Sequence, residues 1–154
     1  MSTPTPTPTP TSSSAPDPTS AALQQTLAAE HAAVFVYGAL GGQTSQSRTP
    51  ALYAAVTAAY TVHRTRRDEL TARIRAAGAE PVAAEPGYQL PADLGSTAAV
   101  TARGRSLEEA AAATYAYLVA SSTGETRGWA VAALIDAAVR GLGFGAAPDR
   151  LPGL

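Results

Sequence analysis

The sequence predicts an all-α protein built as a four-helix bundle, and three observations carry this prediction. Four segments place apolar residues every three or four positions, which is typical of helices with one buried face. Each segment follows a helix-start signal, and no stretch alternates apolar and polar residues as a half-buried strand would. The hydrophobic content of 45% is rich in alanine, the strongest helix former. A length of 154 residues fits a single domain.

The two ends of the chain differ in composition from the middle. Residues 1–16 consist mainly of Thr, Pro and Ser, which cannot build a core, so they predict a disordered tail. Modification of its hydroxyls or docking of its Pro-rich stretch is the alternative role for this tail. We expect the bundle to occupy residues 17–145 and a short C-terminal tail to occupy residues 146–154.

The first two helices are predicted from their start and stop signals. The first begins at Asp17, which suits the N-cap, and Pro18, which suits the first helical position, and it ends at a pair of glycines, 41–42. A short polar loop then leads to a second start at Thr49-Pro50, and this helix runs to residue 77 before Gly78.

A long crossover separates the first two helices from the last two. Residues 79–95 contain three prolines and show no helical period, and 17 extended residues exceed the ~40 Å of the longest predicted helix. Ser96 then caps a third helix that runs to about residue 120, with Gly104 as a weak point. A capping box at residues 122–125 opens a fourth helix, which ends in a glycine-rich run. The crossover predicts an up-down-down-up topology.

A charged residue occupies a core position in the first helix. Steps of three and four residues from Leu23 give the expected inward row: Leu27, Glu30, Val34, Tyr37 and Gly41. A buried carboxylate must be paired, protonated or bound to a metal, because burying it alone costs several kcal/mol or more. The partners considered for Glu30 are Tyr60, His63 or one of the arginines Arg67, Arg105 and Arg127.

The other three helices place polar residues at the level of Glu30. An α-helix rises about 1.5 Å per residue, so positions along different helices can be compared by counting from the predicted helix ends. On this count, four residues lie within one to two turns of the level of Glu30: Tyr60 and His63 in the second helix, Glu108 in the third and Asp136 in the fourth. Two groups follow from this layer. The candidate metal ligands are Glu30, His63, Glu108 and Asp136, and the candidate polar core layer is Glu30, Tyr60, His63 and Arg67. His31 is expected to face solvent or another subunit.

Composition excludes several classes of function. The chain has no cysteine, so disulfides, thiolate metal sites and cysteine nucleophiles are excluded. The net charge of -1 gives no long-range attraction for nucleic acid. The arginines of the second helix are also neutralised locally, because Asp68 lies four residues after Arg64 and Glu69 lies four residues before Arg73. No apolar run approaches the ~20 residues of a membrane span, and no secretory signal is recognisable. We expect a cytoplasmic protein with an unknown protein partner or a homodimer.

Four sequence segments resemble a ferritin-like domain family of unknown function from high-GC bacteria. They are LQQTLAAEHAAVFVYG, YTVHRTRRDEL, the crossover motif GYQLP and LIDAAVRG, and the resemblance covers about residues 21–142. It implies a ferritin-like fold without an assigned reaction. The wider superfamily holds two iron or manganese ions with a Glu from each of two helices and Glu-x-x-His from the other two.

The resemblance also implies an incomplete metal site. Glu30 and Glu108 match carboxylate positions, while Tyr60-Thr-Val-His63 keeps the His but lacks the Glu, and Asp136-Ala-Ala-Val139 has a shorter carboxylate and no His. The leading hypothesis is therefore a non-enzymatic, structural or partner-binding bundle without a complete di-iron centre and without a cofactor. One alternative is a single iron, manganese or zinc ion at the four candidate ligands, with redox or oxygen chemistry. Another is a small apolar ligand held between alanine-lined helices.

Overall fold

The computed structural model describes residues 17–90 and 92–154, and within them the chain forms four helices and no strand. The predicted all-α bundle is confirmed, whereas the predicted tail, residues 1–16, lies outside the described residues. No helix in the described part is both long and apolar enough to cross a membrane. The helices are α1 (Pro18–Gly42), α2 (Pro50–Ala76), α3 (Thr97–Ser121) and α4 (Gly124–Gly143).

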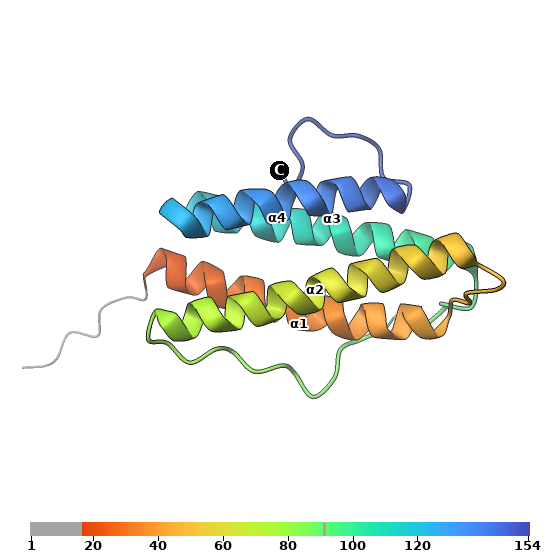
Figure 1. Ribbon diagram of the computed structural model, residues 1–154, viewed down its shortest axis with the longest axis horizontal. Coiled ribbons are helices and arrows are strands. Elements are labelled where there is room, and N and C mark those ends of the chain that lie inside the picture. Colours follow the sequence, from red (N-terminus) through yellow and green to blue (C-terminus); the bar gives the residue numbers. More distant parts are fainter. Residues whose placement is uncertain (1–16, 91) are drawn as a thin grey trace, which may run out of the picture.

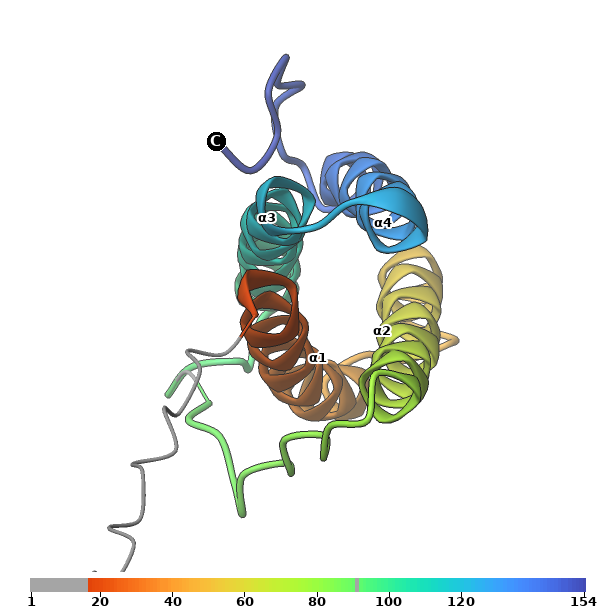
Figure 2. The same cartoon turned by 90° about the vertical axis from the view of Figure 1, so that its left-hand side faces the viewer.

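The topology is up-down-down-up, as predicted. In Figure 1, α1 and α2 form an antiparallel pair, and the crossover then returns along the length of the bundle, so that α2 and α3 run in the same direction. The end view shows α1 beside α2 and α3, with α4 beside α3 (Figure 2). The backbones of α2 and α4 approach each other much less closely than those of the other neighbouring pairs. Long side chains must therefore fill the space between α2 and α4.

Two of the predicted helix caps are confirmed and one prediction is wrong. The side chain of Asp17 accepts a hydrogen bond from the Ser20 amide at 3.3 Å, and that of Ser96 accepts one from Ala99 at 3.1 Å. Ser122, in contrast, does not cap α4. Its hydroxyl donates to the carbonyl of Leu118 at 2.5 Å and so serves the end of α3, because only two residues separate these helices.

The crossover lies along α1 and is held there by side chains of that helix. Gln24 donates to the carbonyl of Glu80 at 2.7 Å and accepts from the amide of Val82 at 2.8 Å. His31 lies 3.2 Å from the carbonyl oxygen of Val82. His31 therefore faces the crossover, which covers the surface of α1 that the sequence left open to solvent or another subunit.

The core consists of two apolar ends separated by a polar middle. One end, formed where α1 ends and α2 begins, contains Val36, Tyr37, Leu40, Val56, Val100 and Phe144. The other end contains Leu23, Leu27, Leu70, Ile74 and Leu118. A smaller alanine-rich cluster joins α3 to α4 through Ala111, Ala112, Tyr115, Ala133 and Ala137. Glu30, His63 and Glu108 are buried between the two ends.

Gly104 is required by close packing and is not merely a weak point of α3. A Cβ atom at this position would lie 2.7 Å from the ring of Phe144, the buried residue that follows α4. The ring of Phe144 in turn lies 6.2 Å from that of Tyr37, centroid to centroid. Small residues in α3 thus allow the aromatic side chains to close this end of the bundle.

We predict that Gly104→Ala destabilises the protein by about 1–3 kcal/mol, because the ring of Phe144 must move to admit the methyl group. Gly38→Ala is the matched control. Its new Cβ would lie 3.8 Å from the Tyr60 ring, an ordinary contact, so the better helix propensity of Ala should stabilise by about 0.5–1 kcal/mol. Urea unfolding of both variants measures the difference, and equal stabilities would contradict the packing argument.

Candidate functional site

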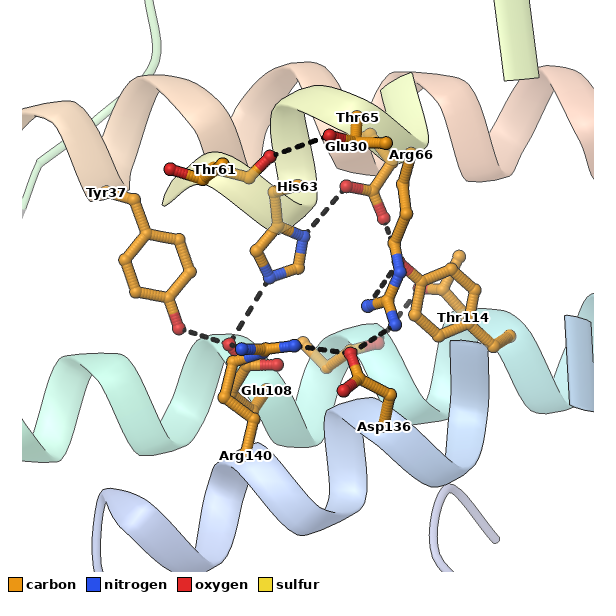
Figure 3. Close-up of polar contacts among 12 residues, drawn as sticks. Glu30, Tyr37, Thr61, His63, Thr65, Arg66, Glu108, Thr114, Asp136 and Arg140 are labelled. Carbon is orange, nitrogen blue, oxygen red and sulfur yellow. Dashed lines mark hydrogen bonds and ion pairs between the residues drawn. The ribbon is translucent and has the colours of Figure 1, made fainter. Parts of the chain in front are cut away.

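The candidate site is a buried imidazole held between two carboxyl groups. His63 on α2 places Nδ1 2.8 Å from Oε2 of Glu30 on α1 and Nε2 3.3 Å from Oε1 of Glu108 on α3 (Figure 3). All three side chains are inaccessible to solvent, with exposures of 0%, 2% and 1% for His63, Glu30 and Glu108. Three of the four helices are therefore joined through one imidazole ring.

Two buried tyrosines donate hydrogen bonds to the carboxyl groups. The hydroxyl of Tyr37 donates to Oε1 of Glu108 at 2.6 Å, and that of Tyr115 donates to Oε1 of Glu30. The ring of Tyr37 also stacks on the imidazole of His63, with centroids 5.2 Å apart. Each carboxyl group therefore accepts a hydrogen bond from one tyrosine and contacts one nitrogen of His63.

Two arginines fill the space between α2 and α4. Arg66 on α2 donates to Oδ2 of Asp136 on α4 at 2.5 Å and to the hydroxyl of Tyr115 at 3.3 Å. Arg140 donates to the same oxygen of Asp136, and its Nε lies 3.5 Å from Oε1 of Glu108 (Figure 3). The layer therefore contains three acidic and three basic side chains, so their charges cancel when all are ionised. We call these six residues the ion layer: Glu30, His63, Arg66, Glu108, Asp136 and Arg140.

The ion layer determines the protonation of its buried groups. Burial alone would lower the pKa of His63, but its hydrogen bonds to Glu108 and Glu30 and their negative charges outweigh burial and raise that pKa from 6.5 to about 9. His63 is therefore an imidazolium at neutral pH, with both ring nitrogens donating. Burial, followed by the nearby carboxylates, raises the pKa of the phenols of Tyr37 and Tyr115 well above the usual range, so both remain neutral.

The structure brings Glu30, His63 and Glu108 together but places two other predicted members of the polar layer elsewhere. Arg67 is partly exposed and pairs with its neighbour Asp68 at 2.7 Å, whereas Arg66 points inward and is only 7% exposed. Tyr60 is half-buried and lies under the guanidinium of Arg64. Arg66 therefore replaces Arg67, because α2 turns that side chain towards the open space beside α4.

Asp136 lies at the margin of the layer and not in its centre. Its side chain is 47% exposed, and it forms ion pairs with Arg66 and Arg140. Val139, which the ferritin-like resemblance compares with a metal-binding His, is 60% exposed and faces away from the interior. The inward positions of α4 at this level are Ala133 and Ala137, which have no ligand atoms. α4 therefore contributes no metal ligand of the Glu-x-x-His type.

The residues present do not fit a di-metal centre. Both nitrogens of His63 are used by carboxylates, and the guanidinium of Arg140 lies against Glu108. Among residues 17–90 and 92–154, no three acidic or His side chains are grouped as metal ligands would be. Two atoms of the ion layer are buried and have no hydrogen-bond partner, Oε2 of Glu108 and Nε of Arg140.

Sequence reasoning missed four members of this network: Arg66, Arg140 and the two tyrosine hydroxyls. Tyr37 lies in the same inward row as Glu30, so its contact with the layer was detectable from helical spacing. Arg140 follows Asp136 by four residues, which is the usual pattern of an exposed helix pair, and nothing local indicates that it turns inward.

Similarity to known proteins covers nearly the whole bundle. The chain matches the protein family described as a domain of unknown function, DUF4439, over residues 22–154. The chain belongs to this family. A solved structure similar to it is that of a conserved hypothetical protein, rv2844, from Mycobacterium tuberculosis. That protein is 30% identical, with a TM-score of 0.75, and the match covers 86% of this chain and 94% of the other.

The DUF4439 match and the mycobacterial structure relate the chain to proteins of the same architecture and unknown activity. No curated protein matches the chain. The relationship includes the C-terminal segment after α4, but it supplies no reaction, ligand or partner.

We predict that stability falls as pH rises from 6.5 to about 9. The folded state holds the His63 proton more tightly than the unfolded chain, so its contribution is complete below pH 6.5 and is lost as pH passes 9, a change of about 3 kcal/mol. Urea unfolding across this range measures it. His63→Gln should abolish the slope and His31→Gln should keep it, whereas a slope that survives His63→Gln would contradict the assignment.

Proposed function

We propose that this protein is a ferritin-like bundle without a complete di-iron centre, and that it acts as a structural or partner-binding protein and not as an enzyme. The observation that carries the proposal is the imidazolium of His63 between Glu30 and Glu108. In a ferritin-like metal protein, carboxylates at this level would hold metal ions. Here a protonated side chain of the protein itself supplies the positive charge. A cytoplasmic location, expected from the sequence, is part of the same proposal.

Charge compensation supports a structural role for the layer. Buried ions lose their hydration, and this cost is offset only where geometry and additional hydrogen bonds are favourable. Both carboxylates of the central trio accept bonds from His63 and from a tyrosine, and Arg140 approaches Glu108 from α4. Because the partners come from four helices, sliding any helix by one turn breaks several bonds at once. The layer therefore specifies one register of the bundle.

The alternative function is that of a protein holding a single iron, manganese or zinc ion. The unpaired Oε2 of Glu108 favours this alternative, because it is a buried acceptor that a cation would satisfy. Glu30, His63 and Glu108 are the residues that would hold the ion, while Asp136 remains with its two arginines. Binding would require His63 to lose a proton and Arg140 to leave Glu108. The closed network therefore opposes the alternative.

Elemental analysis separates the two functions. Protein produced and purified in the presence of iron, manganese and zinc salts should contain less than stoichiometric amounts of each metal, because His63 and Arg140 occupy the positively charged positions. A stoichiometric ion that disappears in Glu30→Ala would contradict the proposal and establish the metal-binding alternative.

Adjacent residues of α3 provide a test of the structural role. Glu108→Ala should cost about 3–5 kcal/mol, because it leaves His63 and Arg140 buried with one carboxylate fewer. Glu109→Ala should change stability by less than about 0.5 kcal/mol, because that side chain is 60% exposed. Urea unfolding at neutral pH gives both values. Similar values for the two variants would show that the layer does not hold the bundle together.

A further inference from the structure

A cavity of about 510 Å³ lies between α3, α4 and the C-terminal segment, residues 146–154. Figures 1 and 2 show this segment leaving the end of α4 and turning back along the outside of α3 and α4. Sites for small molecules commonly have volumes of about 300–1,000 Å³. The cavity is therefore large enough to hold a ligand.

The C-terminal segment is seated closely on α3 and forms the outer wall of the cavity. Gly153 has a φ angle of +87°, and a Cβ atom at this position would lie 2.5 Å from the carbonyl oxygen of Ala112. Only glycine allows this conformation and this close an approach of the two backbones. The ring of Pro152, which also lines the cavity, restricts the backbone just before the contact. The segment therefore covers the space between the helices.

Small side chains keep the interior of the cavity open and mainly apolar. Four alanines of α3 and α4 line it: Ala112, Ala113, Ala137 and Ala138. Gly141 lies where the cavity meets the ion layer, because a Cβ atom there would lie 3.6 Å from Cβ of Glu108 and 3.5 Å from Cβ of Ala146. An apolar molecule gains free energy when it leaves water for such a space.

The inner wall of the cavity includes a carboxyl group with an unused acceptor. Among the described residues, the charged side chains that line the cavity are all acidic: Glu108, Glu109 and Asp149. Glu109 and Asp149 are exposed, whereas Glu108 is 1% exposed. Oε2 of Glu108 has no hydrogen-bond partner. A buried acceptor without a donor costs free energy, and a donor on a ligand would recover it.

A hydroxyl group suits this acceptor better than an ammonium group or a carboxylate. The charges of the ion layer already cancel, so a cation would add an unbalanced charge beside His63 and Arg140. A carboxylate would lie among acidic side chains. Nε of Arg140 also lacks a hydrogen-bond partner and lies 3.5 Å from Oε1 of Glu108. A hydroxyl group can donate to Oε2 of Glu108 and accept from this nitrogen.

We propose that the cavity binds a small neutral alcohol with an aliphatic body, whose hydroxyl group donates to Oε2 of Glu108. The body then packs against the alanines of α3 and α4 beneath the C-terminal segment. Such a ligand leaves the ion pairs between the helices in place. The inference therefore goes beyond the proposed structural role and does not depend on it.

A titration with matched ligands tests the contact without altering Glu108, which the ion layer requires. In NMR spectra of the alanine methyl groups, n-octanol should shift the signals of Ala112 and Ala137 to saturation. Methyl octyl ether has the same alkyl chain but cannot donate, so it should bind about tenfold more weakly. Octanoate should also bind more weakly than n-octanol, because of the acidic lining. Equal affinities for the alcohol and the ether, or tighter binding of octylamine than of n-octanol, would overturn the proposal.

A pair of α4 variants tests the location of the site. Ala138→Phe should abolish saturable binding of n-octanol, because Ala138 lines the cavity and the phenyl ring would fill it. Ala132→Phe is the matched control. Ala132 is exposed on the same helix and does not line the cavity, so this variant should bind n-octanol as the unmodified chain does. The same spectra show whether each variant is folded. Shifts that never saturate in the unmodified chain, or normal binding by folded Ala138→Phe, would show that the cavity is not the site.

Discussion

The hydrogen bonds from His63 to Glu30 and Glu108 are the interaction on which the rest of the structure depends. They join α1, α2 and α3 at the level where the core is otherwise least apolar. Because both carboxylates are buried, the imidazole must stay protonated, and the tyrosines must stay neutral to donate to them. Arg140 and Arg66 then extend the same network to α4, whose backbone lies too far from α2 for apolar packing alone. One protonated ring thus fixes the charges and the register of four helices.

Residues of types that can bind metal ions are held in another way in this bundle. Glu30, His63 and Glu108 are ligand types, yet each is used by another side chain of the protein. On the α4 side, Arg140 lies against Glu108, and the buried positions of α4 at this level are alanines. In this DUF4439 protein, both ring nitrogens of His63 are therefore used by carboxyl groups of the protein itself.

The sequence was sufficient to predict the four helices and the grouping of Glu30, His63 and Glu108 in one layer. It was not sufficient to predict which arginines surround them. Helical spacing and start signals predicted the four helices and the burial of Glu30, since these depend on local patterns. The choice between Arg66 and Arg67 was not predictable. The two residues lie about 60° and 40° to either side of His63, and which side faces α4 is decided by the packing of the whole bundle. Asp136 and Arg140 look like an exposed helical pair in sequence. Only the distance between α2 and α4 shows why Arg140 turns inward.

Nitrogen NMR of the His63 ring tests the central claim most directly. The chain contains two histidines, so a His31→Gln variant assigns the remaining ring signals to His63. At neutral pH the account predicts that both ring nitrogens carry protons and that the ring loses one near pH 9. A neutral ring at neutral pH, with one nitrogen unprotonated, would contradict the account, because Glu30 and Glu108 would then share no buried cation between them.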